Sequence, residues 1–192
     1  MRCTHMLAGI ASAGLVAASL GMGAPASAAT VNGTGGNDHL RGTPHSETIR
    51  AFGGNDRVYA LAGADLIAVG SGSDRVDAAR GDDTIRGGNQ GDLLGGGLGD
   101  DTIYGGAGND GSSGGAGSDV IFGGAGADGS GSAIYPLDGA GADTIYGGRG
   151  NDDVILADDG TPDTVICGPG KDQVCRRPVW EAWGPRSESF TG

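Results

Sequence analysis

The sequence predicts an all-β fold: a parallel β-roll, or two-sheet β-solenoid, in which each coil takes 18 residues. Three periodic features indicate it. An acidic residue returns every nine positions, an aliphatic residue follows most of these acids by two positions, and glycines precede them in the pattern Gly-Gly-x-Gly-x-Asp-x-apolar-x. A short period kept over most of a chain is typical of a solenoid. One repeat supplies one turn and one strand, so two repeats are needed to close a coil.

The acidic residues keep their step through two insertions. They run without a slip from Asp38 to Asp128, resume at Asp143 after six extra residues, and close with Asp163 and Asp172 after two more. The full series is Asp38, Glu47, Asp56, Asp65, Asp74, Asp83, Asp92, Asp101, Asp110, Asp119, Asp128, Asp143, Asp152, Asp163 and Asp172. A flexible linker has no reason to hold such a register, so the 43 glycines indicate ordered turns.

Each nonapeptide divides into a turn and a short strand. The Gly-Gly-x-Gly-x-Asp part predicts the turn, because glycine reaches positive φ angles at little cost. The x-apolar-x part predicts a three-residue strand whose middle side chain points inward. The middle residues suit strands because most are β-branched; they are Leu40, Ile49, Val58, Ile67, Val76, Ile85, Leu94, Ile103, Ile121, Ile145, Val154, Val165 and Val174. Ser112 and Ser130 interrupt this row and are expected to stack on each other.

Two rows of acids are expected, one on each side of the roll, because residues 18 apart stack on the same side. One row carries Asp38, Asp56, Asp74, Asp92, Asp110, Asp128, Asp152 and Asp172. The other carries Glu47, Asp65, Asp83, Asp101, Asp119, Asp143 and Asp163. This assignment assumes that Ser130 to Gly141 bulges out without changing the side on which the next repeat falls.

The stacked carboxylates predict a site for a hard divalent cation. Neighbouring coils lie about 4.8 Å apart, so a row of like charges repels itself unless cations lie between the turns. Calcium accepts six to eight oxygens from carboxylates and backbone carbonyls in loose geometry, whereas magnesium demands a tighter octahedron. No Cys or His recurs in the repeat, which disfavours softer metals. Calcium is therefore the expected metal.

The repeat resembles the RTX, or haemolysin-type, calcium-binding nonapeptide family over about residues 33 to 175. The best copies are Gly96-Gly97-Leu98-Gly99-Asp100-Asp101-Thr102-Ile103-Tyr104 and Gly147-Gly148-Arg149-Gly150-Asn151-Asp152-Asp153-Val154-Ile155. The resemblance implies a β-roll with calcium held between turns by the sixth-position Asp and by glycine carbonyls. Carried onto this chain, the carboxylate ligands are Asp83, Asp92, Asp101, Asp110, Asp119, Asp128, Asp143 and Asp152. The implied carbonyl ligands belong to Gly97, Gly99, Gly106, Gly108, Gly115, Gly117, Gly124, Gly126, Gly148 and Gly150.

The first coils depart from the family pattern. The turn before Asp65 lacks the Gly-Gly pair, and the turn before Glu47 contains Pro44 and no fourth-position glycine. These coils are expected to be partly occupied by calcium or to be structural only. Many RTX proteins also carry a toxin or enzyme domain, for which this chain has no room, so toxin activity is not carried over.

The ends of the chain differ from the repeats. Residues 1–28 are expected to be a signal peptide, because Leu7 to Met22 is apolar and Ala26-Ser27-Ala28 fits the cleavage rule; a retained membrane anchor is the alternative. Removal would leave 11 basic and 24 acidic residues, a net charge of −13, which repels nucleic acid and anionic membranes. A secreted roll over residues 29–175 and a C-terminal cap or flexible tail over 176–192 are therefore expected.

Two cysteines remain after removal of the signal. Cys167 and Cys175 bracket the final repeat, and an even number of cysteines in an oxidising compartment favours a disulfide. The alternative is two free thiols on opposite sheets, because the Cα atoms of a disulfide must come within about 7 Å.

No catalytic pattern emerges, so the protein is expected not to be an enzyme. Acid pairs such as Asp82-Asp83 and Asp100-Asp101 fit a ligand beside a solvated neighbour, because a catalytic pair needs unequal environments and a repeat gives each pair nearly the same one. Neither a Gly-x-Ser-x-Gly nor a His-Glu-x-x-His motif occurs. An outward row containing Tyr104, Phe122 and Tyr146 has two readings, a stabilising ladder or a face that binds a glycan, an unknown protein partner or ice.

Overall fold

The computed structural model describes residues 15–17, 29–131, 141–157, 160–177 and 189–191, and these form two parallel sheets of nine strands each. The first sheet contains, in spatial order, β1 (Leu15–Ala17), β3 (His39–Arg41), β5 (Arg57–Tyr59), β7 (Arg75–Arg80), β9 (Leu93–Leu98), β11 (Gly111–Ala116), β13 (Gly129–Gly131), β15 (Asp153–Ala157) and β17 (Gln173–Arg177). The second contains β2 (Ala29–Asn32), β4 (Glu47–Arg50), β6 (Leu66–Ser71), β8 (Thr84–Asn89), β10 (Thr102–Ala107), β12 (Val120–Ala125), β14 (Thr144–Arg149), β16 (Thr164–Ile166) and β18 (Ser189–Thr191).

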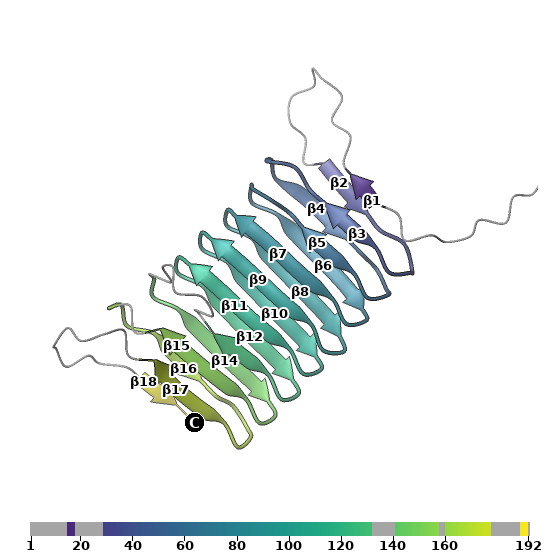
Figure 1. Cartoon of the computed structure of the whole chain (residues 1–192). Coiled ribbons are helices and arrows are strands. Elements are labelled where there is room, and N and C mark those ends of the chain that lie inside the picture. The colour runs from purple at the N-terminus through teal and green to yellow at the C-terminus, as the bar shows by residue number, and fades with distance from the viewer. Residues whose placement is uncertain (1–14, 18–28, 132–140, 158–159, 178–188, 192) are drawn as a thin grey trace, which may run out of the picture.

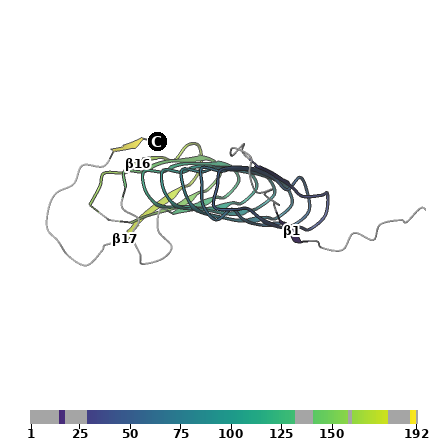
Figure 2. The ribbon, with the colours of Figure 1, turned by 90° about the horizontal axis from the view of Figure 1, so that it is seen from above.

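Consecutive strands alternate between the two sheets, so the chain winds as a flattened solenoid of about 18 residues per coil (Figures 1 and 2). Strands of neighbouring coils pair in parallel and in repeat register; Thr102 of β10, for example, lies between Thr84 of β8 and Val120 of β12. The predicted all-β parallel roll is confirmed. Among the described residues there is no helix long and apolar enough to cross a membrane.

The strands in the middle of the roll are longer than predicted. Strands such as β10 and β12 have six residues rather than three, because they continue through the two glycines of the next repeat. Gly106, for example, stays in register between Gly88 and Gly124. The strand also includes the third residue of the repeat, such as Ala107, so the turn is reduced to the Gly-x-Asp part.

The core consists of the predicted inward row and a second row that the sequence reading missed. All the predicted inward aliphatic residues from Leu40 to Val165 are buried. In the N-terminal coils the first position of the repeat also points inward and carries Ala51, Ala60, Val69 and Ala78, all at 0% exposure. From Gly87 onward a glycine occupies most of these positions, so the N-terminal coils bury more apolar side chain than those that follow.

Ser112 is a polar defect in this core. Its backbone pairs with Leu94 on one side and Ser130 on the other, as the sequence predicted. Its side chain is buried, and its hydroxyl has no hydrogen-bond partner. We expect Ser112→Ala to stabilise the roll by about 1 kcal/mol, because an unpaired buried hydroxyl is costly. Thermal unfolding in calcium measures this. The neighbouring outward residue gives the control, Ser113→Ala, and equal melting temperatures for both variants would contradict the argument.

The predicted disulfide between Cys167 and Cys175 is not found. Cys167 carries a free thiol and packs against the core just after β16. Cys175 belongs to β17, whose strand lies in the opposite sheet. The repeat thus assigns the two residues to different sheets, which is the alternative that the sequence left open. The strand β1 lies inside the predicted signal peptide and pairs with β3, whereas Trp180 and Trp183 of the predicted cap lie outside the described residues.

Candidate functional site

The sixth-position acids form two ladders that run along the roll at its turns. In each ladder a carboxylate oxygen accepts a hydrogen bond from the backbone N–H of the equivalent acid in the preceding coil. The Asp83 N–H donates to Asp101 Oδ1 and the Asp101 N–H donates to Asp119 Oδ1, both at 2.8 Å. One ladder continues from Asp119 to Asp143 and Asp163, across the insertion. The two rows therefore have the predicted membership.

The second carboxylate oxygen has no partner along most of each ladder. These side chains are 1–5% exposed, yet their Oδ2 atoms make no hydrogen bond. The residues concerned are Asp56, Asp65, Asp74, Asp83, Asp92, Asp101, Asp110, Asp119, Asp128 and Asp152. A buried oxygen that bears negative charge and lacks a donor is unfavourable. From Asp56 to Asp128 each coil thus presents one such oxygen on each side, which is the donor type that calcium takes.

The first acid of each ladder differs from the rest. Asp38 Oδ2 accepts hydrogen bonds from the backbone N–H and the hydroxyl of Thr34, at 2.6 and 2.9 Å. Glu47 is held in the same way by the backbone and hydroxyl of Thr43. These two acids are satisfied locally and close the N-terminal ends of the ladders. The departure of the first turns from the repeat therefore removes Asp38 and Glu47 as candidate ligands, whereas Asp56, Asp65 and Asp74 keep a free oxygen.

The first glycine of the repeat makes room for the carboxylate. A Cβ atom on Gly96 would lie 2.1 Å from Asp101 Oδ2, and one on Gly114 would lie 2.0 Å from Asp119 Oδ2. Gly87 and Gly105 stand in the same relation to Asp92 and Asp110. The sequence analysis had given these glycines only a conformational role. The sequence feature that could have indicated this role is that each of these glycines lies five residues before a ladder acid.

The second and fourth glycines are required by backbone conformation. All ten glycines predicted to offer carbonyls have φ between +107° and +149°: Gly97, Gly99, Gly106, Gly108, Gly115, Gly117, Gly124, Gly126, Gly148 and Gly150. Within the described part of the chain, no hydrogen bond is recorded to the carbonyl oxygens of the fourth-position members, such as Gly99 and Gly117. These carbonyls are consequently free to accept a cation.

The residue before each acid forms an outer ladder of opposite sense. Asp82 Oδ1 accepts from the Asp100 N–H at 3.0 Å, and Asp100 Oδ1 accepts from the Ser118 N–H at 2.8 Å. Asp82 and Asp100 are exposed, whereas Asp83 and Asp101 are buried. The acid pairs are therefore a buried acid beside a solvated neighbour, as the repeat predicted. The backbone N–H groups of the buried ladder donate to the following coil, whereas those of the outer ladder donate to the preceding coil. The buried and outer ladders thus tie successive coils together in both directions.

No three side chains of His, Cys, Asp or Glu converge on one point among the described residues. This follows from the repeat, because each coil brings a single buried carboxylate to each side. A calcium ion at a turn would thus need backbone carbonyls to complete its six to eight ligands. The donor set available at the turns, carboxylate and carbonyl oxygens, fits that requirement.

Burial raises the pKa values of the ladder acids from Asp56 to Asp128. Desolvation is the largest cause, the backbone hydrogen bond opposes it, and neighbouring acids add to it. The pKa of Asp101 rises to about 8 and that of Asp92 to about 7. Asp83, Asp119 and Asp128 rise to about 6. The metal-free turns thus hold protons that the unfolded chain, with Asp at 3.8, would release.

The calcium-free roll is expected to be more stable at pH 5 than at pH 8. Because the folded-state pKa of Asp101 lies above its unfolded value, the folded state binds more protons, and stability falls as pH rises from about 3.8 to about 8. Circular dichroism of protein stripped of metal, recorded from pH 4 to 8, measures this. In saturating calcium, the stability of the roll should depend less on pH. A metal-free roll that gains stability towards pH 8 would contradict the assignment.

The outward aromatic row is a self-stacked ladder. The rings of Tyr104 and Phe122 lie 4.9 Å apart with planes at 4°, and those of Phe122 and Tyr146 lie 4.7 Å apart at 7°. The Arg86 guanidinium covers the ring of Tyr104 at 5.5 Å. The faces of these rings therefore stack on one another, which supports the interpretation of the row as a stabilising ladder. This stacking leaves little ring face on which a sugar could stack.

The comparison with family models gives a match that agrees with this geometry. The family described as RTX calcium-binding nonapeptide repeat (4 copies) matches residues 28–51, 41–76, 50–85, 77–111, 112–129 and 137–160. A comparison with curated proteins gave no match. The matched segments span well over half of the chain, and they contain the ladders and the glycine turns described above. The chain belongs to the RTX calcium-binding nonapeptide repeat family.

Proposed function

We propose that this protein is a secreted, non-catalytic calcium-binding roll, in which calcium bound at the turns completes the fold. The unpaired, buried Oδ2 atoms carry the proposal. They recur once per coil on each side from Asp56 to Asp128, where desolvation by burial raises the pKa values of the carboxyl groups, such as those of Asp101 and Asp92. A cation between successive turns would remove both costs.

The ligands proposed for calcium come from two chemical groups. The carboxylates belong to Asp83, Asp92, Asp101, Asp110, Asp119, Asp128, Asp143 and Asp152, and the carbonyls to the second and fourth glycines of the same turns. Asp56, Asp65 and Asp74 carry the same unpaired oxygen and join this set. Bound calcium would supply positive charge between coils and no reaction chemistry. The protein's own residues hold the turns in place, through the Oδ1 ladder and the glycine conformations.

Calorimetric titration of calcium tests the proposal with a matched pair of variants. Asp101→Asn/Asp119→Asn keeps an oxygen for each ladder hydrogen bond and removes the charge at the unpaired position. We expect it to lose calcium sites. Asp82→Asn/Asp100→Asn removes the same charge from exposed neighbours and also keeps their ladder oxygens, so its calcium binding should stay close to that of the unmodified protein. Equal calcium binding by both variants would refute the proposed ligands.

Export and the absence of catalysis are supported by the sequence. Ala26-Ser27-Ala28 fits a cleavage site, and intact-mass measurement of exported protein should give a chain that begins at Ala29. The ladder acids share nearly one environment, so no pair of them has the unequal surroundings that acid–base catalysis needs. Detection of Met1 in exported material would contradict the cleavage.

A further inference from the structure

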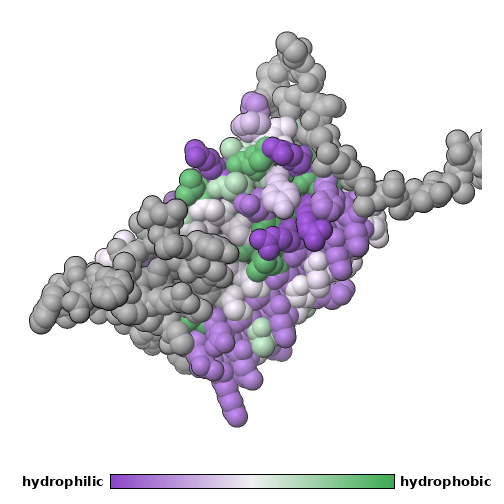
Figure 3. Space-filling model, in the orientation of Figure 1, coloured by the Kyte–Doolittle hydropathy of each residue, from purple (hydrophilic) through white to green (hydrophobic). Residues whose placement is uncertain are grey.

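Basic residues gather on the outside of the N-terminal coils, although the protein is acidic. Residues 29–86 contain eight acids and six arginines, whereas residues 87–175 contain 14 acids and two basic residues. Six of the eight N-terminal acids are the buried ladder residues, so only Asp77 and Asp82 are exposed there. All six arginines are exposed. In Figure 3 the deepest purple, the most hydrophilic colour, gathers over this half of the visible face.

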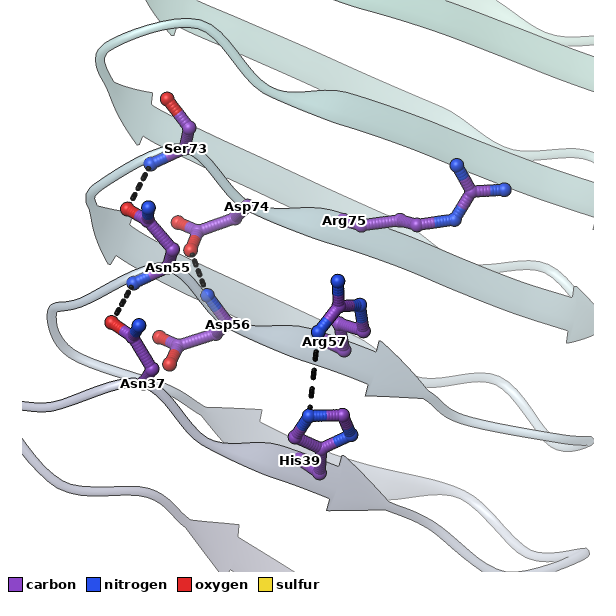
Figure 4. Close-up of a pocket in the computed structure, with 8 residues that line it drawn as sticks. All are labelled: Asn37, His39, Asn55, Asp56, Arg57, Ser73, Asp74 and Arg75. Carbon is purple, nitrogen blue, oxygen red and sulfur yellow. Dashed lines mark hydrogen bonds between the residues drawn. The ribbon is translucent and has the colours of Figure 1, made fainter. Parts of the chain in front are cut away.

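Two of these arginines and a histidine lie in one row across neighbouring strands. His39 of β3, Arg57 of β5 and Arg75 of β7 are direct partners in the sheet register. They line a groove of about 470 Å³ together with Asn37, Asn55, Ser73 and the ladder acids Asp56 and Asp74 (Figure 4). Arg57 Nη1 lies 3.4 Å from His39 Nε2. The backbone positions of the row are therefore about one strand spacing, roughly 4.8 Å, apart.

Folding does not account for this row. Like charges directly opposite each other in a sheet are destabilising. Among the described residues, no ion pair joins Arg57 or Arg75 to a carboxylate. At the edge of the groove, Asp74 Oδ1 accepts the Asp56 N–H at 2.7 Å, and the unpaired Oδ2 atoms of both acids are buried. In Figure 4 the Arg75 side chain extends away from Asp74, so its guanidinium is free for another partner.

The turn amides add neutral donors to the same groove. Asn37 Oδ1 accepts the Asn55 N–H at 2.7 Å, and Asn55 Oδ1 accepts the Ser73 N–H at 3.0 Å. Because each amide oxygen is used by the outer ladder, the Nδ2 hydrogens are left as the donors that each side chain can offer. The groove therefore combines two guanidinium groups with two amide donors, whereas its carboxylates are confined to the turn.

We propose that the row of His39, Arg57 and Arg75, with Asn37 and Asn55, binds a sulfate or phosphate group. Arginine binds such oxyanions through two parallel N–H···O bonds, and a tetrahedral dianion has enough oxygens to engage guanidiniums of two neighbouring coils. The group can be a free inorganic anion or an ester on a larger extracellular ligand.

The test compares two charge-matched variants in millimolar calcium, with sodium sulfate, dextran sulfate and unsulfated dextran as probes. Arg57→Gln/Arg75→Gln removes the row. Arg50→Gln/Arg149→Gln removes two exposed arginines from strands β4 and β14 of the other sheet. We expect the first variant to lose about tenfold in sulfate affinity, the second to stay within about twofold, and unsulfated dextran not to bind.

The outcomes separate the possible sources of the anion. Binding of sodium sulfate that depends on Arg57 and Arg75 supports a site for the free anion, and binding of dextran sulfate alone with the same dependence supports an ester. Failure of both sulfated probes to bind, or an equal loss by the two variants, overturns the inference. The circular dichroism of each sample is also measured with and without calcium, to show whether the chain folds in response to calcium. Arginine-dependent binding in a chain that does not respond to calcium would sink the proposed function and leave this inference standing.

Discussion

Removing calcium is expected to abolish most of the strand signal of this protein, and millimolar calcium is expected to restore it. In the metal-free roll the ladder acids are buried, carry unpaired oxygens and repel their neighbours. Calcium modules outside the cell often have affinities of about 10⁻⁴–10⁻³ M, so a free concentration of about 10 mM stabilises each bound site by about 1.4–2.7 kcal/mol. Four such sites give about 6–11 kcal/mol, which matches the whole stability of an ordinary domain.

Far-UV circular dichroism with chelator and then with calcium measures this response. Magnesium at equal concentration is the control for charge screening, and it should restore less of the signal because it demands a tighter octahedron. Replacing Asp101 and Asp119 together by Ala should weaken the response more than replacing Asp65. An unchanged strand signal in chelator would sink the central proposal.

The substitution Gly96→Ala is expected to destabilise the roll strongly, although it adds a single methyl group. Its Cβ atom would lie 2.1 Å from Asp101 Oδ2 and 2.7 Å from the Gly114 carbonyl oxygen, so the carboxylate has to move. Overpacking of this kind costs about 1–3 kcal/mol. Because the displaced oxygen is also a proposed calcium ligand, the calcium midpoint of folding should rise about tenfold, which corresponds to about 1.4 kcal/mol.

The adjacent glycine provides the control for this substitution. A Cβ atom on Gly95 would meet nothing closer than the Val76 carbonyl oxygen at 3.5 Å, which is ordinary contact, and no positive φ is recorded there. Gly95→Ala should therefore leave the calcium midpoint unchanged or lower it slightly, since alanine restricts the unfolded chain. Calcium titrations followed by circular dichroism compare the two variants. Equal midpoints would show that the first glycine of the repeat does not shape the site.

The repeat allowed the fold and both rows of acids to be predicted, because a nine-residue period leaves few ways to place a side chain in a solenoid. The period could not reveal how the two oxygens of each carboxylate are used. That Asp101 Oδ1 binds the preceding coil while its Oδ2 is left unpaired depends on side-chain orientation between coils. The capping of Asp38 by Thr34 was hidden for another reason, since it involves a residue that breaks the repeat.

Two errors have a common origin in treating each repeat alone. The strand length was underestimated because Gly105 and Gly106 look like turn residues in sequence, whereas register with neighbouring coils holds them in a sheet. The bridge between Cys167 and Cys175 was favoured because these two cysteines remain after signal removal and bracket the final repeat. The alternation of strands between sheets separates them, and that alternation is a property of the whole roll.

The second inward row of the N-terminal coils gives the roll a direction of growth. A solenoid folds as a linear array in which each unit depends on its neighbours, so the unit that costs least to order becomes the seed. Ala51, Ala60, Val69 and Ala78 bury extra methyl groups there, whereas later coils carry glycine at most of these positions and rely on a cation for cohesion. We expect the early coils to form a template whose open edge recruits the rest one coil at a time, as in the addition of subunits to a filament. Calcium would then control how many coils fold after the N-terminal ones.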